Sequence, residues 1–159
     1  MSNIFNASEI YEFAKQIEVN GEKFYNMMAI KFDDPEIKEL FEFLAKEEVN
    51  HKRIFTDMLS KLENYNLHES YGGEYLNYLH AYADNLLFTF DKFDDDISKV
   101  EDIESALQFA IGKELDTILY FQEMKNVVLA HQKDLLDNII EEERKHVTLL
   151  AEKKRALVK

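Results

Sequence analysis

The 159-residue sequence has no cysteine, one proline and four glycines. Without cysteine, the chain can form no disulfide, no zinc ribbon and no thiolate-bound iron site. So little proline and glycine leaves few turn signals for a fold of many strands, and apolar residues recur at helical spacing along most of the chain. A chain of this length can bury a core as one domain. We therefore predict an all-α protein, a single helical-bundle domain over residues 1–159.

Basic residues are also scarce, because 19 Lys and Arg stand against 32 Asp and Glu, giving a net charge of −13. This balance argues against nucleic acid or an anionic membrane as a partner. No apolar run approaches the length of a membrane span, and the N-terminal sequence MSNIFNASEIYEF lacks a basic region followed by an apolar block. We expect a cytoplasmic protein without a signal peptide.

Two segments place polar residues where a bundle helix should bury leucine. Apolar residues from 37 to 62 recur in steps of four and three, and Glu48 and His51 occupy the middle of that stripe. Glu143 and His146 occupy the same positions in the stripe of residues 136–150. An unpaired carboxylate in an apolar interior is costly, so a chain that buries one neutralises it or supplies a cation.

Two further predicted helices carry a glutamate in the inward stripe, Glu18 in the first and Glu114 in the third. We predict that Ser98 and Glu101 form a capping box that begins the third helix. Gly21 lies one turn after Glu18 and costs about 1 kcal/mol of helix stability relative to alanine. It indicates either a close helix contact or space kept open beside that carboxylate.

The four glutamates pair at equal distances from two predicted turns. The midpoint of the first pair is residue 33, where Asp34 is the expected N-cap and Pro35 the first helical residue. The midpoint of the second pair predicts a turn near residues 127–131. The pattern of the first hairpin recurs in the second after 95 or 96 residues, which indicates a duplicated hairpin. We divide the chain into hairpin one at about 6–64, a crossover at about 65–97 and hairpin two at about 98–157.

The crossover is predicted to contain one helix, from residue 74 to about 90, ended by the acidic run at 91–96. Four tyrosines at helical spacing favour packing on the bundle or a dimer contact, with an aromatic relay or a partner surface as the alternative; they are Tyr71, Tyr75, Tyr78 and Tyr82. The remaining histidines lack a glutamate in register and are expected to be surface or packing residues; they are His68, His80 and His131.

Four carboxylates and two imidazoles would meet at one level of such a bundle. In each Glu-x-x-His segment, the glutamate and the histidine lie on the same face of the helix. The charge of four carboxylates balances that of two divalent ions. Mixed nitrogen and oxygen ligation suits iron or manganese. We predict a dinuclear metal site whose ligands are Glu18, Glu48, His51, Glu114, Glu143 and His146. The alternative is a metal-free cluster in which these groups satisfy one another by hydrogen bonds.

At these positions the chain resembles the rubrerythrin branch of the ferritin-like di-iron proteins, over nearly its whole length. The resemblance implies a ferritin-like four-helix bundle of two duplicated hairpins with an extra crossover helix. It implies two iron ions, with manganese or a mixed pair as alternatives, bridged by Glu48 and Glu143. Tyr25 would then be a catalytic hydrogen-bond donor beside the metals.

Two features depart from the family pattern. Rubrerythrins carry a four-cysteine rubredoxin-like iron site, so here electrons would come from a separate carrier such as a rubredoxin-like protein. The family has a second glutamate one turn after the one matched by Glu114, and Thr117 stands there. The six remaining ligands also resemble the di-iron centre of bacterioferritins.

We expect a homodimeric hydrogen peroxide reductase of oxidative-stress defence, with oxygen as the other candidate oxidant. Two alternatives stay open, a ferroxidase or iron-handling protein, and a metal-independent helical interaction module.

Overall fold

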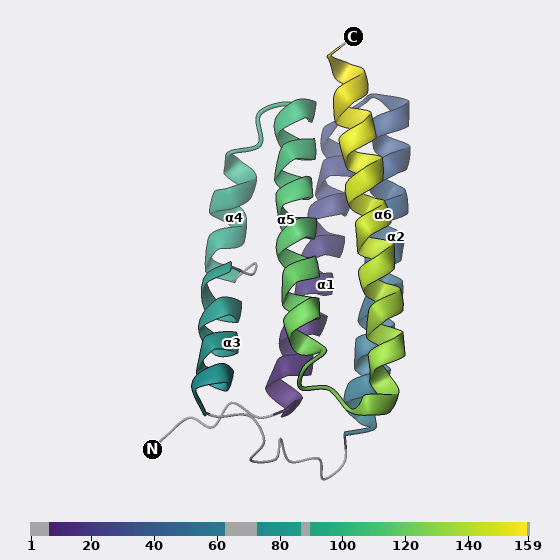
Figure 1. Ribbon diagram of the computed structural model, residues 1–159. Helices are drawn as coiled ribbons and strands as arrows, with labels where there is room; N and C mark the ends of the chain where they lie inside the picture. The colour runs from purple at the N-terminus through teal and green to yellow at the C-terminus, as the bar shows by residue number, and fades with distance from the viewer. Residues whose placement is uncertain (1–6, 63–72, 87–89, 159) are drawn as a thin grey trace.

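The computed structural model describes residues 7–62, 73–86 and 90–158, and no strand occurs among them. Four long helices form an antiparallel bundle, with two shorter helices end to end along its outside (Figure 1). The long helices are α1 (Ala7–Lys31), α2 (Pro35–Ser60), α5 (Ile103–Met124) and α6 (Lys133–Leu157). The prediction of an all-helical bundle with four long helices is confirmed for the described residues. Within the described residues, no helix is long and apolar enough to span a membrane.

The turn between α1 and α2 forms where the sequence predicted it. The Asp34 side chain accepts hydrogen bonds from the backbone N–H groups of Glu36 at 3.0 Å and Ile37 at 3.1 Å. Pro35 is the first helical residue, a position at which its missing N–H group has no helical partner to lose. The second turn, between Met124 and Lys133, contains a short 3₁₀ helix, η1 (Ala130–Gln132), at the predicted place.

The third bundle helix begins later than predicted, because its capping box consists of Asp102 and Ser105 rather than Ser98 and Glu101. Helix α5 begins at Ile103, after Asp102, whose side chain accepts from the Ser105 N–H group at 2.8 Å while the Ser105 hydroxyl accepts from Asp102 N. Both Ser98 and Asp102 precede a suitable partner by three residues, so the local pattern alone does not separate them. Ser98 instead ends the preceding helix.

The crossover contains two helices, where one was predicted. Helix α3 (Gly73–Leu86) ends before residue 90, and the acidic run that was expected to end a helix lies inside α4 (Phe90–Ser98). Phe93 is buried, so α4 is anchored by an apolar contact while Asp94 and Asp95 face solvent. The crossover boundary at residue 65 and the residues Tyr71 and His68 lie outside the described part of the chain.

Helix α3 packs on α5 through its tyrosines, as predicted. The Tyr75 hydroxyl donates to Glu123 Oε2 at 2.6 Å, and the Tyr82 hydroxyl donates to the Asp116 carbonyl at 3.1 Å. The Tyr82 ring also stacks on the buried Tyr120 ring, with centroids 6.0 Å apart.

The apolar core consists of two clusters separated by one polar layer. The cluster near the α1–α2 turn includes Phe24, Phe41 and Leu107, and the cluster near the α5–α6 turn includes Phe55 and Leu136. The boundary between the two clusters lies at the same height along the bundle axis in all four helices. The buried glutamates and histidines of the sequence prediction lie at that level, closed off from water at both ends of the bundle.

Candidate metal centre

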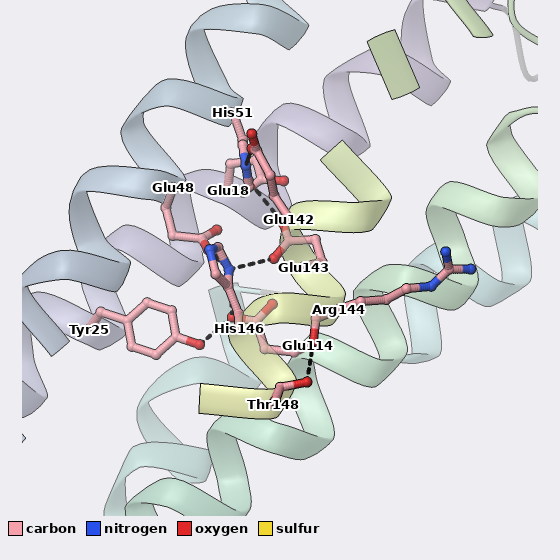
Figure 2. A network of polar contacts seen from close by, with 10 residues as sticks. All are labelled: Glu18, Tyr25, Glu48, His51, Glu114, Glu142, Glu143, Arg144, His146 and Thr148. Carbon is pink, nitrogen blue, oxygen red and sulfur yellow. Dashed lines mark hydrogen bonds and ion pairs between the residues drawn. The ribbon is translucent and has the colours of Figure 1, made fainter. Parts of the chain in front are cut away.

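Six polar side chains from the four bundle helices point toward one another in the middle of the core (Figure 2). Helix α1 supplies Glu18, α2 supplies Glu48 and His51, α5 supplies Glu114, and α6 supplies Glu143 and His146. Each is at most 5% exposed. The structure therefore brings together every residue that the sequence predicted as a ligand.

The six residues form two overlapping groups of four, each offering ligand atoms within 4.8 Å of one another. The His51 group consists of Glu18, Glu48, His51 and Glu143, and the His146 group consists of Glu48, Glu114, Glu143 and His146. Glu48 and Glu143 belong to both groups. This is the arrangement that two metal ions bridged by two carboxylates require.

Both imidazole rings turn Nδ1 toward the carboxylates. His51 Nδ1 lies 3.0 Å from Glu143 Oε1, and His146 Nδ1 lies 2.9 Å from Glu143 Oε2. The two rings are nearly parallel, with centroids 5.8 Å apart. Glu143 therefore lies between the two histidines, with one carboxylate oxygen toward each.

Several buried atoms of the cluster have no hydrogen-bond partner within the described chain. They are both oxygens of Glu18, Oε1 of Glu48, Nδ1 of His51 and Oε1 of Glu143. His51 Nδ1 and Glu143 Oε1 are close but not aligned as donor and acceptor, so the atoms converge on shared points rather than on one another. A hydrogen-bonded polar cluster would not leave so many buried polar atoms unpaired, whereas divalent cations fit this donor set.

Comparison with known proteins agrees with this geometry. The family model for Rubrerythrin matches residues 9–154, which is nearly the whole chain. The chain belongs to the rubrerythrin family. A crystal structure from Thermotoga maritima, assigned there to the ferritin-like diiron-carboxylate proteins, is similar with 25% identity and a TM-score of 0.68, covering 94% of this chain and 95% of that one. A comparison with curated proteins gave no match.

Burial controls the protonation of this rubrerythrin-family centre when no metal is bound. It raises the pKa of Glu18 and of Glu48 well above the usual value. Burial together with the charge of Glu143 raises the pKa of Glu114 to about 8. Burial acts on Glu143 in the same direction, but the two histidines outweigh it and hold that pKa below its usual range.

The histidines respond in the opposite sense to their burial. Burial disfavours the imidazolium, but the neighbouring carboxylates outweigh it and raise the pKa to about 10 for His51, through Glu143 first, and to about 10 for His146, through Glu114 first. The metal-free centre thus holds protons at neutral pH on both imidazoles and on Glu114. Ligation requires neutral imidazoles and ionised carboxylates, so metal binding displaces these protons.

Glu142 is a contributor that the sequence analysis missed. Its Oε2 lies 2.7 Å from His51 Nε2, on the side of the ring away from the cluster, and its side chain is 44% exposed. A carboxylate that accepts from Nε2–H holds the imidazole in the orientation that leaves Nδ1 facing the centre. Glu142 lies 100° around α6 from Glu143, so it is outside the inward stripe, and no pattern within α6 pointed to it.

Tyr25 reaches the centre from α1, as the resemblance implied. Its hydroxyl donates a hydrogen bond to Glu114 Oε1. The ring is stacked on Phe41, with centroids 5.9 Å apart, so its orientation is set by the apolar cluster. Burial, followed by the charge of Glu114, raises the pKa of Tyr25 well above its usual value, which keeps the proton on the phenol.

Gly21 provides space for a carboxylate, but for Glu48 rather than for Glu18. A Cβ atom at position 21 would lie 2.7 Å from Glu48 Oε2, closer than real Cβ atoms approach an oxygen. The Glu48 side chain of α2 occupies this space, so of the two sequence interpretations the close contact between helices fits the structure, and open space beside Glu18 does not.

The other histidines that the structure describes lie outside both ligand groups. His80 on α3 makes an edge contact with the Phe13 ring, with centroids 6.2 Å apart, and His131 is exposed in η1. Thr117, at the position of the family's second glutamate, is buried one turn from Glu114 and brings no carboxylate to the centre.

Proposed function

We propose that this protein is a non-haem di-iron oxidoreductase that reduces hydrogen peroxide to water. The observation that carries the proposal is the pair of overlapping ligand groups sharing Glu48 and Glu143, in a chain of the rubrerythrin family. The balance is H₂O₂ with two electrons and two protons giving two water molecules. Manganese or a mixed pair is the alternative metal content.

Two iron ions held by the six ligands would supply the two electrons that cleave the oxygen–oxygen bond and the positive charge that stabilises the product oxygen. The chain supplies the rest. The four carboxylates balance the charge of the cations, the two Nδ1 atoms fix their places, and the apolar clusters on either side exclude bulk water. Tyr25 holds a proton at its hydroxyl, directed at Glu114 and close to where a substrate oxygen would be reduced.

The reductant in this proposal is a separate electron carrier, such as a rubredoxin-like protein, because the chain has no cysteine with which to hold an iron–sulfur site. We also propose that the protein acts as a homodimer in the cytoplasm. The centre lies deep between four helices, so electrons from a docked carrier would reach it through the bundle.

A ferroxidase is the second candidate, and Thr117 is the observation that favours it. Six ligands without a further carboxylate at this position are what the bacterioferritin resemblance predicts. A ferroxidase should assemble as a large cage that takes up many irons per chain, whereas a peroxide reductase needs only a dimer-sized particle.

Stopped-flow oxidation of the anaerobic Fe(II)-loaded protein separates the two functions. Hydrogen peroxide and oxygen are mixed with it at equal concentration, and oxidation is followed by absorbance. We expect peroxide to react faster by orders of magnitude. Oxidation by oxygen at an equal or greater rate would refute the peroxidase and favour the ferroxidase.

A further inference from the structure

A small cavity reaches the centre between α1 and α5. Its polar wall consists of Glu48, Glu114, Tyr25 and Thr117, and Gly21 lies on the α1 side. The space open to the centre of a water-sized sphere is about 20 Å³. On this measure one water molecule needs about 10–15 Å³, so the cavity has room for about one to two water-sized groups, the size class of a ligand of two or three non-hydrogen atoms.

The cavity exists because two positions carry unusually small or short groups. Position 21 has no side chain, and a Cβ there would press on the Glu48 carboxylate. Position 117 holds threonine where the family pattern has a glutamate, whose longer side chain would extend into this space. The candidate metal centre is therefore accessible from this cavity between α1 and α5, whereas the two apolar clusters cover it toward both ends of the bundle.

Thr117 differs from the other helical threonines of the chain in its hydrogen bonding. The Thr56 hydroxyl donates to the Lys52 carbonyl at 2.8 Å, and the Thr148 hydroxyl donates to the Arg144 carbonyl at 3.1 Å. Among the described residues, the Thr117 hydroxyl has no such bond, although the residue is only 6% exposed. Because Thr117 lines the cavity and its hydroxyl has no such partner among the described residues, that hydroxyl is available to a molecule inside the cavity.

Lys113, one turn along α5 from Thr117, also lines the cavity. Its Nζ lies 3.9 Å from Asp96 Oδ2 on α4, and its side chain is 23% exposed. The cavity thus joins the buried centre to a partly exposed cation. A polar or anionic molecule of a few atoms fits this path, and an organic substrate does not.

We propose that this cavity binds the small oxidant and that Thr117 is a positioning residue, whose hydroxyl hydrogen-bonds an oxygen atom of that oxidant. The inference rests on the proposed function and deepens it, because it assigns the place and the size class of the substrate, hydrogen peroxide or oxygen. It also gives the threonine a role in place of the missing carboxylate: it leaves room for the substrate and orients it.

Azide binding to the ferric-loaded protein, measured by absorbance titration, tests the proposal without turnover. Thr117→Val keeps the volume and removes the hydroxyl, Thr117→Ser keeps the hydroxyl, and Thr117→Leu fills the cavity. We expect valine to weaken azide binding about threefold to tenfold, the value of one hydrogen bond. Serine should stay within about twofold of the unmodified protein, leucine should abolish binding, and metal content should be equal in all four proteins.

Three results would overturn the proposal: no azide binding by the unmodified protein, unchanged binding by the valine and leucine variants, or a serine variant as weak as the valine variant. The last result would show that the hydroxyl is not the cause. The outcome is independent of the kinetic test. If oxygen reacts as fast as peroxide, the peroxidase fails while the azide series still locates the ligand; if the azide series fails, the rate comparison stands.

Discussion

Raising the pH should destabilise the metal-free protein, because its two buried histidines hold protons that the unfolded chain releases. The pKa of His51 and of His146 is about 10 in the folded protein. In the unfolded chain a histidine titrates near about 6.5. A raised pKa contributes stability that is complete below the unfolded value and is lost as the pH rises through the folded value. From about pH 7.5 to about pH 9.5 the folded state thus binds about two more protons than the unfolded state.

The magnitude follows from that number of protons. Each excess proton lowers the free energy of unfolding by about 1.4 kcal/mol per pH unit, so two lower it by about 2.7 kcal/mol per unit. For a chain of this size the melting temperature should fall by about 5–11 °C per pH unit. Glu114, whose pKa rises from 4.5 to about 8, acts in the same direction up to that pH. Glu143, with its lowered pKa, is ionised throughout and adds no slope.

The assay is thermal unfolding followed by circular dichroism, with chelator present, across this pH range. His51→Gln and His146→Gln should each roughly halve the slope, and the double variant measures what the rest of the chain contributes. His131→Gln, which changes an exposed histidine outside the centre, should leave the slope unchanged. A melting temperature that stays flat or rises with pH would refute the reasoning, as would an equal effect of the His131 substitution.

Two further substitutions test the surroundings of the ligands. Gly21→Ala should lower metal affinity, because its Cβ would displace the Glu48 carboxylate, whereas Gly112→Ala, with no atom within 4 Å of the new Cβ, should bind metal normally and gain about 1 kcal/mol of helix stability. Glu142→Ala should weaken metal binding about 10-fold to 100-fold, because His51 loses the acceptor that orients its ring. Titration with Fe(II) under argon measures both effects.

The matched control for position 142 is Glu141→Ala. Glu141 is its neighbour on α6, is exposed and pairs only with Arg144 among the described residues, at 3.0 Å. Equal loss of affinity in the two alanine variants would assign the effect to surface charge rather than to the histidine. For position 21, metal binding as strong as that of the Gly112 variant would show that Glu48 moves aside at no cost.

The bundle and its ligands could be predicted from the sequence because both depend on periodicity along single helices. Glu48 and His51 interrupt an apolar stripe, and a carboxylate in such a stripe is informative wherever it occurs. The equal distances of paired glutamates from a turn then fixed which helices lie side by side. These signals survive without any knowledge of tertiary contacts.

The features that were missed depend on contacts between helices. The acidic run of α4 resembles a helix terminator, but burial of Phe93 against the bundle holds it helical. The two candidate capping boxes before α5 have equivalent local sequence patterns, so the use of Asp102 as the N-cap could not be predicted from either pattern alone. Glu142 acts on a histidine of another helix, and the neighbour of Gly21 is Glu48 on α2 rather than Glu18 on its own helix. No pattern within one segment contains this information.

The sharing of ligands between the hairpins would make a bound metal centre a cross-link of the fold. The His51 group takes three residues from the first hairpin and only Glu143 from the second, while the His146 group takes only Glu48 from the first hairpin and three residues from the second. Neither hairpin contains a complete group of four, so a metal ion bound by either group would link α6 to α2.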